Sequence, residues 1–415
     1  MREPTAQDLV DGFRAAVAAA EPGAAVRAAL ACVDGVVTVG SDVIGRFDPD
    51  HIVVVGIGKA AAAMADAASE ITGAVRGIVA TPYPSDSSFP VLVGGHPIPN
   101  DASLLAGRAL LELVGSLGSN ELVIAVVSGG GSAAAEVPAH GVSLADLQEM
   151  NETLVASGAP IEEINQVRAA VSRLKAGGLR SSMSSATVVT LVLSDVVNGG
   201  PEMVASGPTI PSALGSMASE IIEAHGLGAK MPKAITDAIQ RFVPNEARPD
   251  DVVVVVGSSA MAADAALRSL QSKGLNATIA TAQLTGDVED AVAELLAASK
   301  AGSVWIAAGE TTVNVTGHGV GGRNQHAALT AAMALAGTGG VFGAFGTDGI
   351  DGSTDVAGAV VDGATVELAT HRGWDVTGEL AAHNTNSVLA DIGSTVATGP
   401  TGTNVGDLWL WFVGA

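Results

Sequence analysis

Short runs of β-branched and other apolar residues recur along the first half of the chain, and most lead through a glycine-rich turn into a helical pattern. The runs are "HIVVVGIG", "RGIVAT", "VLVGG", "ELVIAVVSGGG" and "TVVTLVLSDV". Strands this short and this apolar are typical of a parallel sheet that is buried on both faces. The alternation therefore predicts an α/β fold with a mostly parallel sheet and helices on both of its faces.

The length of the chain predicts two domains, because 415 residues exceed what one hydrophobic core usually supports. The charged, proline-containing segment "RFVPNEARPDD" precedes a new apolar run, "VVVVVGSS". We therefore expect an N-terminal domain over residues 1–245 and a second α/β domain over residues 250–415 that begins with this run and ends in the strand "DLWLWFVGA". Residues 5–46 carry helical spacing and are expected to be helical.

Charge and cysteine content exclude several classes of function. The formal net charge of −23 opposes binding to nucleic acids and to anionic membrane surfaces. The single cysteine, Cys32, cannot form an internal disulfide or a cysteine-based zinc site. The first thirty residues lack the order of a signal peptide, and no apolar run reaches the roughly 18 residues that span a bilayer. We expect a soluble cytoplasmic protein, and the sequence leaves its oligomeric state open, a homodimer included.

The first glycine turn, "GIGKAA", fits a variant of the dinucleotide-binding fingerprint. A nicotinamide site also requires an acid about 20 residues further on, at the end of the next strand, to hold the ribose. That strand ends at Thr81 and Pro82 without an acid. Gly58 and Lys59 instead place an ammonium group at a helix start, which favours a phosphoryl group.

A second glycine loop follows another buried strand in "VVSGGGSAAAE". Three consecutive glycines can turn several backbone N–H groups toward one point, and such a nest binds anions without a lysine. The spacing of neither a Walker A loop nor a hydrolase elbow is present. The loop is therefore a candidate cradle for phosphate groups, formed by Ser128, Gly129, Gly130, Gly131 and Ser132.

Charged residues follow several of the other expected strands. Asp195 lies where open α/β sheets bind their ligands, and an acid there can accept a proton or hold a metal ion. Glu310 also follows a strand, and Asp351 lies in a glycine-rich segment. Arg323 lies at a helix start, where the helix dipole opposes its charge, so an anionic partner is expected there. Together these residues fit phosphoryl transfer, in which cations and a metal ion surround the moving group.

Several long motifs resemble those of the glycerate 2-kinase family, whose members carry a C-terminal MOFRL domain. They run collinearly from about residue 7 to 411 and include "GIGKAAAAMA", "GGHPIPNDAS", "VVSGGGSAA", "IEEINQVR", "GETTV…GGRNQ", "GTDGIDGSTDVAGA" and "TGPTGTNVGDL". The resemblance implies two three-layer α/β/α domains, the first Rossmann-like and the second of MOFRL type, with an active site in the cleft between them. It also implies ATP and Mg²⁺ as cofactors and Lys59 and Arg323 as the catalytic lysine and arginine.

The resulting hypothesis is an ATP- and Mg²⁺-dependent kinase that phosphorylates the 2-hydroxyl of D-glycerate to give 2-phosphoglycerate. Asp195 is a catalytic candidate for contact with that hydroxyl. Asp195 and Asp351 are the candidate metal ligands, and Glu310 and Asp351 are candidates for contact with Mg²⁺ or with the substrate.

The sequence departs from the family pattern at two pairs of positions, so the exact hydroxy acid stays open. Ala169 and Ala170 replace a Lys–His pair, and Gly199 and Gly200 replace two acids. The alternatives are a kinase of another small hydroxy acid, an NAD(P)H-dependent hydroxypyruvate reductase, and a catalytically silent protein that binds sugar acids. The sequence does not say which acid would be the base and which would bind metal.

Overall fold

The structure is a computed structural model that describes residues 2–183 and 185–414. Its internal contacts divide the chain into two compact units. The unit called here the N-terminal unit comprises Pro22–Ser194 and Gly199–Val256, and the C-terminal unit comprises Met1–Glu21, Asp195–Asn198 and Gly257–Ala415.

A six-stranded sheet with the order β6-β5-β4-β7-β8-β9 forms the centre of the N-terminal unit. All pairs from β6 to β8 are parallel, as the alternating pattern predicts. Every residue of β4 and β7 is buried, which explains their unbroken apolar runs. The strands are β4 (Ile52–Ile57), β5 (Arg76–Thr81), β6 (Val91–Val93), β7 (Leu122–Ser128), β8 (Thr187–Leu193) and β9 (Val252–Gly257).

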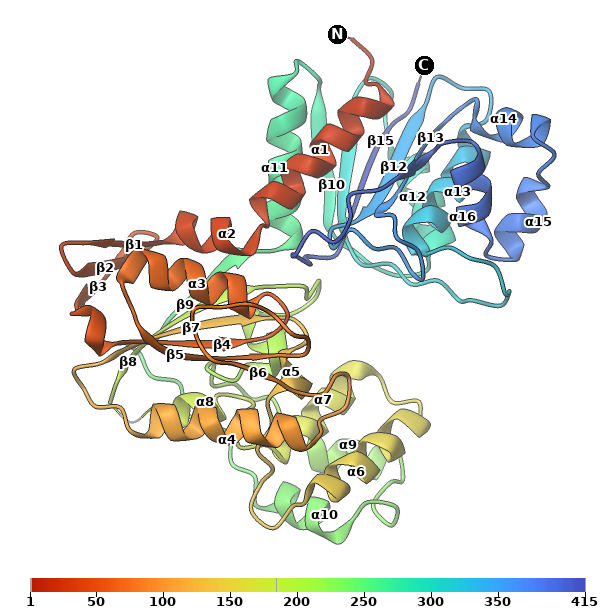
Figure 1. Cartoon of the computed structure of the whole chain (residues 1–415). Coiled ribbons are helices and arrows are strands. Elements are labelled where there is room, and N and C mark those ends of the chain that lie inside the picture. Colours follow the sequence, from red (N-terminus) through yellow and green to blue (C-terminus); the bar gives the residue numbers. More distant parts are fainter. Residues whose placement is uncertain (1, 184, 415) are drawn as a thin grey trace. The chain divides into compact units, whose positions relative to one another are not determined.

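Helices cover both faces of this sheet, and Figure 1 shows α3 and α4 on opposite sides of it. Four further helices, α6, α7, α9 and α10, pack around an apolar cluster of their own, which includes Leu154, Val167 and Ile235. This small helical layer carries Asn151 and Arg168, which line a cavity of the unit. The helices of the unit are α2 (Pro22–Ala29), η1 (Pro49–His51), α3 (Ala61–Thr72), α4 (Asp101–Gly115), α5 (Gly131–Ala134), α6 (Leu144–Ala156), α7 (Ile161–Ala170), α8 (Gly178–Ser181), η2 (Pro201–Ser206), α9 (Ala218–Ala224) and α10 (Lys233–Gln240).

The helical expectation for residues 5–46 is wrong for residues 30–46. Residues 30–46 form an antiparallel sheet of β1 (Leu30–Val33), β2 (Val36–Val39) and β3 (Asp42–Arg46). Asp34 and Gly35 connect the first two strands, and both have positive φ. An Asp-Gly pair between runs of valine is a strong hairpin signal, and here it outweighs the helical spacing of the apolar residues.

The C-terminal unit is also a three-layer α/β structure, but its six-stranded sheet is mixed. The order is β10-β11-β15-β12-β13-β14, in which only the β10–β11 pair is parallel. The last strand of the chain is therefore central, and it carries the fully buried Trp409 and Trp411. The strands are β10 (Ala277–Leu284), β11 (Val304–Gly309), β12 (Val341–Gly346), β13 (Gly358–Asp362), β14 (Thr395–Val396) and β15 (Asp407–Phe412).

Helices α1 and α11 cover one face of the mixed sheet, and α12 to α16 lie on the other (Figure 1). The ring of Phe13 on α1 stacks on Phe345 of β12, with the centroids 4.5 Å apart. This contact explains why the first helix belongs to the C-terminal unit. The helices are α1 (Ala6–Ala19), α11 (Ser259–Ser272), α12 (Val288–Ala298), α13 (Arg323–Leu335), α14 (Thr365–His371), α15 (Val376–Ala381) and α16 (Thr385–Asp391).

The division into units differs from the expected split into residues 1–245 and 250–415 at both ends of the first domain. The start of the chain joins the C-terminal unit, because α1 packs on α11 and on the mixed sheet. The run "VVVVVG" forms β9, which lies beside β8 in the first sheet and does not begin the second one. The α/β class, the mostly parallel first sheet and the strand at the end of the chain are as expected.

Candidate active site

Two loops of the N-terminal unit meet at the carboxyl edge of its sheet. Strands β4 and β7 are parallel neighbours, with Ile57 opposite Val127, so the loops that follow them leave the sheet side by side. The backbone N–H of Lys59 donates a hydrogen bond to the carbonyl oxygen of Gly129 at 2.9 Å. Asp195 follows β8, the strand on the other side of β7, by two residues and is half-buried. Three predicted site segments thus follow adjacent strands.

The second glycine loop packs directly against the first glycine turn and occupies the space beside Gly58. A methyl group at Gly58 would lie 2.3 Å from both the carbonyl oxygen and the Oγ of Ser128. The amide of Ala60 donates to the same Oγ at 3.0 Å. Because the amides of Lys59 and Ala60 are already bonded within the protein, they are not available to a dinucleotide pyrophosphate. The glycine at position 58 is therefore explained by close packing between two loops.

The second glycine loop retains donors for an anion. Gly130 has a φ of +78°, and its lack of a side chain leaves room for the aliphatic stem of Lys59. Within the described residues, the amides of Gly130, Gly131 and Ser132 have no hydrogen-bond acceptor. Free amides close to an ammonium group make an anion-binding concavity. The structure thus brings the predicted lysine to the predicted cradle.

A cavity of about 150 Å³ adjoins this loop within the N-terminal unit. Its lining includes a buried ion pair between Lys175 and Glu136, each 4% exposed at the side chain. Burial and the charge of Lys59 lower the pKa of the neighbouring His96, so its imidazole is neutral at pH 7. The other polar lining residues are Ser132, Asn151 and Arg168. The sequence singled out none of His96, Glu136, Asn151, Arg168 and Lys175 as site residues, although His96 and Arg168 lie in motifs that carry the family resemblance.

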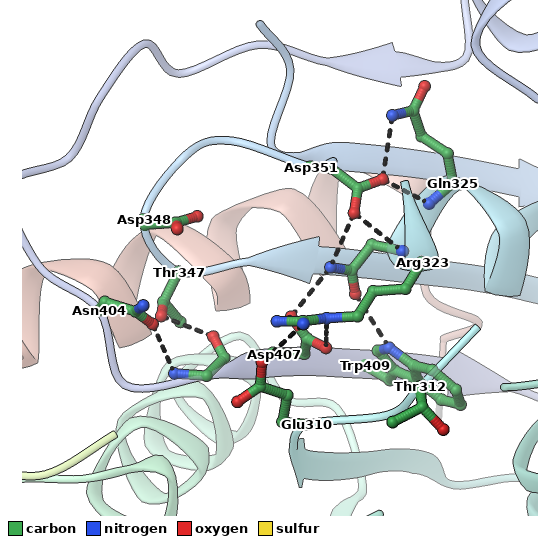
Figure 2. Close-up of polar contacts among 12 residues, drawn as sticks. Glu310, Thr312, Arg323, Gln325, Thr347, Asp348, Asp351, Asn404, Asp407 and Trp409 are labelled. Atoms are coloured by element: carbon green, nitrogen blue, oxygen red, sulfur yellow. Dashed lines mark hydrogen bonds and ion pairs between the residues drawn. The ribbon is translucent and has the colours of Figure 1, made fainter. Parts of the chain in front are cut away.

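Arg323 belongs to the C-terminal unit, where carboxylates surround it (Figure 2). Its Nε and Nη2 donate to the two oxygens of Asp407 at 2.7 and 3.1 Å, and its Nη1 donates to Glu310 at 2.6 Å. The anionic partner expected at this helix start is thus supplied by the protein itself. A guanidinium group has five N–H donors, so two remain for a ligand among the described contacts.

Asp407 is the buried residue that holds Arg323 in place, and it is not among the site residues predicted from the sequence. Burial raises the pKa of Asp407 to about 6, although the charge of Arg323 opposes this shift. Its Oδ1 also accepts a hydrogen bond from Asn324 Nδ2 at 2.9 Å, and Asn324 Oδ1 accepts one from the indole of Trp409 at 3.1 Å. The sequence signal for Asp407 is its place directly before the apolar run "LWLWF", because a charge there needs a buried partner.

Asp351 caps the helix that carries Arg323. Its two oxygens accept four hydrogen bonds from the backbone and side-chain amides of Asn324 and Gln325, at 2.8 to 3.3 Å. Helix α13 begins after Gly322, which has no side chain to cap it, so Asp351 supplies the missing acceptors from another loop. These contacts give Asp351 a structural role, whereas Glu310 is exposed and near Arg323.

The residues expected to hold a metal ion are Asp195 and Asp351, and this assignment stays a prediction. No group of three or more His, Cys, Asp or Glu side chains in the described part of the chain has the arrangement of a metal site. Asp351 does not fit Mg²⁺, because amide donors occupy both of its oxygens. Asp195 offers the kind of carboxylate that Mg²⁺ takes alongside substrate phosphates and water.

The departures from the family pattern lie outside the cavity lining. Ala169 and Ala170 are 0% and 3% exposed and pack into apolar clusters. Gly199 has a φ of +130°, and both Gly199 and Gly200 lie in the loop after Asp195. The alanine pair is therefore part of the core of this chain.

Two α/β units, the first with glycine loops at the carboxyl edge of its sheet, define an α/β protein. Comparison with known families gives the particular class: residues 8–240 match the domain of unknown function DUF4147, and residues 303–407 match the MOFRL family. A D-glycerate 2-kinase of Thermotoga maritima is 37% identical, with 90% of this chain and 93% of that protein covered. A glycerate 2-kinase of Pyrococcus horikoshii is 34% identical, with 87% of each chain covered.

The chain belongs to the glycerate 2-kinase family. The solved structure of the Thermotoga maritima glycerate kinase matches with a TM-score of 0.88 at 33% identity, over 98% of this chain and 99% of that one. A protein of Agrobacterium vitis that is 36% identical over 87% of this chain and 99% of its own length is named provisionally as a hydroxypyruvate reductase. No helix in the described residues is long and apolar enough to cross a membrane.

Proposed function

We propose that this protein is a kinase that transfers the γ-phosphoryl group of ATP to the 2-hydroxyl of D-glycerate, with Mg²⁺, to give 2-phosphoglycerate. Membership of the family and the names of its relatives support glycerate phosphorylation. The observation in this chain that carries the proposal is the position of Lys59 on a glycine loop whose amides have no acceptor in the described residues. That combination suits a phosphoryl group, which needs positive charge and several aligned donors.

Lys59 and the loop from Ser128 to Ser132 would bind and neutralise the phosphates. Lys59 is exposed and has no ion pair among the described residues, so its ammonium can move with a phosphoryl group. The amides of the loop are fixed by the backbone and require no reorganisation when charge develops. The lysine and the loop thus contribute a mobile charge and a preorganised set of donors.

Arg323 would supply the second cation of the reaction. Asp407 and Glu310 fix its guanidinium through three N–H groups, and two N–H groups remain for phosphate oxygens. Burial alone would lower the pKa of Arg323, but the charges and hydrogen bonds of Asp407 and Glu310 outweigh this effect and raise the pKa. An arginine side chain is effectively always protonated in proteins, so this group is a permanent cation.

Asp195 would contact the 2-hydroxyl of the substrate as base or orienting group, because it follows a strand of the sheet edge that bears the two glycine loops. It is also the candidate ligand of Mg²⁺, an ion that would neutralise phosphate charge when bound. Glu310 accepts a hydrogen bond from Arg323 and is therefore a candidate for contact with the substrate.

Hydroxypyruvate reduction is the second candidate, and the name of one relative favours it. The contacts of the first glycine turn count against it. Ser128 and Gly129 occupy the acceptor positions opposite the amides of Ala60 and Lys59, which a dinucleotide pyrophosphate would need. The turn lacks the ribose-binding acid as well.

One assay separates these functions. The purified protein is incubated with ATP, Mg²⁺ and a panel of C3 and C4 hydroxy acids, and any phosphorylated product is identified by NMR. We expect 2-phosphoglycerate from D-glycerate. Oxidation of NADH by hydroxypyruvate without a coupling enzyme would instead support the reductase. Ligand binding with neither reaction would support a silent sugar-acid binding protein.

A further inference from the structure

The lining of the cavity beside the glycine loop includes a cation that makes no ion pair with a carboxylate in the described part of the chain. Arg168, in the last turn of α7, lines this cavity. In the described part of the chain it makes no ion pair, although it is half-buried. Charged groups removed from water are normally paired, because desolvation is costly. An uncompensated guanidinium in a cavity wall indicates an anionic occupant, even in a chain whose net charge is −23.

The nearest acid of the lining cannot serve as the missing partner. Glu136 accepts hydrogen bonds from Ser172 Oγ at 2.5 Å and from the amide of Val137 at 2.9 Å on one oxygen. Its other oxygen is paired with the ammonium of Lys175. Glu136 is therefore paired with Lys175. Its charge also attracts Arg168, but burial outweighs this attraction and lowers the pKa of Arg168, which is left as the charge of the lining without an ion pair.

A hydrogen bond to Nε holds the guanidinium of Arg168 and leaves its two terminal nitrogens available to a ligand. Its Nε donates to Asn151 Oδ1 at 2.6 Å, and Asn151 Nδ2 donates in turn to the carbonyl oxygen of Leu147 at 2.8 Å. Asn151 is buried, so this contact fixes the plane of the guanidinium. Apart from a long contact of 3.5 Å from Nη1 to Asn165, the terminal nitrogens have no partner in the described residues. Two such N–H groups match the two oxygens of a carboxylate.

The size and neighbours of the cavity limit what the anion can be. About 150 Å³ lies below the range of roughly 300–1,000 Å³ usual for drug-sized ligands, so a small acid fits better than a nucleotide. The lining includes His96 and Gly130, and the aliphatic stem of Lys59 lies against Gly130. A ligand whose carboxylate lies on Arg168 would therefore have its other end near the loop assigned to the phosphates.

We propose that Arg168 is the carboxylate-binding residue of the hydroxy-acid subsite, positioned by Asn151 within this cavity. The proposal rests on the kinase function proposed above for the choice of ligand. It assigns the recognition of the acid group to the helical layer and the phosphoryl chemistry to the glycine loops. Selectivity for an acid over a neutral polyol then depends on one guanidinium group.

The test compares Arg168→Gln with a matched control, Arg173→Gln. Arg173 is exposed, lies five residues further on and is not part of the lining, so its replacement removes the same charge from the same neighbourhood. Binding of D-glycerate without nucleotide is measured by calorimetry, and KM is measured separately for D-glycerate and for ATP. D-Glyceramide, which keeps the hydroxyls but has no carboxylate, serves as the neutral probe.

We expect Arg168→Gln to weaken D-glycerate binding and raise its KM by roughly 10–100-fold, as for the loss of a charge-assisted hydrogen bond. The KM for ATP should stay within about twofold, and the preference for D-glycerate over D-glyceramide should collapse. Arg168→Lys, which keeps the charge without the fork, should fall between the two. Arg173→Gln should behave as the parent does.

The outcomes distinguish this proposal from the proposed function. Unchanged D-glycerate binding in a folded Arg168→Gln protein, with turnover intact in the parent, overturns the subsite and leaves the kinase function in place. Binding of D-glycerate that depends on Arg168, in a parent that phosphorylates no hydroxy acid, supports the subsite and overturns the kinase function. An increase in the KM for ATP alone would mean that Arg168 binds phosphate, and it would overturn the proposal.

Discussion

The stem of Lys59 lies directly over Gly130. A methyl group at position 130 would be 2.9 Å from both Cγ and Cε of Lys59, closer than carbon atoms normally approach. The two residues are 71 positions apart in sequence (130 − 59) and come together because β4 and β7 are adjacent parallel strands. The glycine loop therefore sets the path of the lysine side chain and contributes free amides beside it.

Gly130→Ala should impair turnover through Lys59. The new methyl group displaces the flexible stem, and a misplacement of about 1 Å in a catalytic group costs on the order of 100-fold in rate. The positive φ adds roughly 1–2 kcal/mol of strain. Gly158→Ala is the matched control, since Gly158 has a φ of +74° but nothing within 4 Å of a new methyl group. Equal turnover in the two variants, measured at similar folded fractions, would refute the effect on Lys59.

Lys59→Ala and Arg323→Ala should both reduce kcat by orders of magnitude, because cations at a phosphoryl group act mainly in the transition state. They should differ in stability. Lys59 is exposed, so its loss should change the unfolding free energy by less than about 0.5 kcal/mol. Removal of Arg323 leaves Asp407 buried without its partner and should cost roughly 3–5 kcal/mol.

The double variant Arg323→Gln with Asp407→Asn separates these two effects of Arg323. Replacing both charges by amides should restore much of the lost stability, because no uncompensated charge remains buried. It should not restore kcat. Recovery of turnover together with stability, as followed by denaturant unfolding and the kinase assay, would show that Arg323 is only structural.

Asp351→Ala should destabilise the fold without changing the dependence on Mg²⁺. The carboxylate accepts four hydrogen bonds at the start of α13, so we expect a loss of at least about 1–2 kcal/mol. Asp351→Asn, which keeps one oxygen acceptor, should lose less. The check is a Mg²⁺ titration of turnover at a temperature where each variant is folded. A large increase in the Mg²⁺ concentration needed for half-maximal rate would make Asp351 a metal ligand after all.

The sequence predicts the N-terminal sheet well because each parallel strand there is a local, unbroken apolar run. It identifies Lys59 and the glycine loop for the same reason, since strand–turn–helix patterns are local. The placement of β9 and α1 depends on packing between segments far apart in sequence, which no local pattern encodes. Asp407 and Arg168 were missed because what distinguishes them is the presence or absence of a buried partner. Only the folded structure shows that property.

The raised pKa of Asp407 predicts a particular dependence of stability on pH. Its carboxyl group has a pKa of about 6 when folded, against about 3.9 in an unfolded chain. Between these two values the folded state binds the proton and the unfolded state does not. Stability contributed by this group is therefore greatest below pH 4 and is lost as the pH rises to 6, by about 3 kcal/mol in total.

Asp407→Asn isolates this contribution, because asparagine keeps the shape of the side chain and cannot titrate. The unfolding free energies of parent and variant should be measured at intervals from pH 4 to 8. Subtracting one curve from the other largely cancels the contributions of all other titrating groups. Relative to the variant, the parent should lose stability from pH 4 to 6 and then remain level. A difference that is flat from pH 4 to 6 would mean that the ion pair with Arg323 keeps Asp407 ionised and that burial does not control its titration.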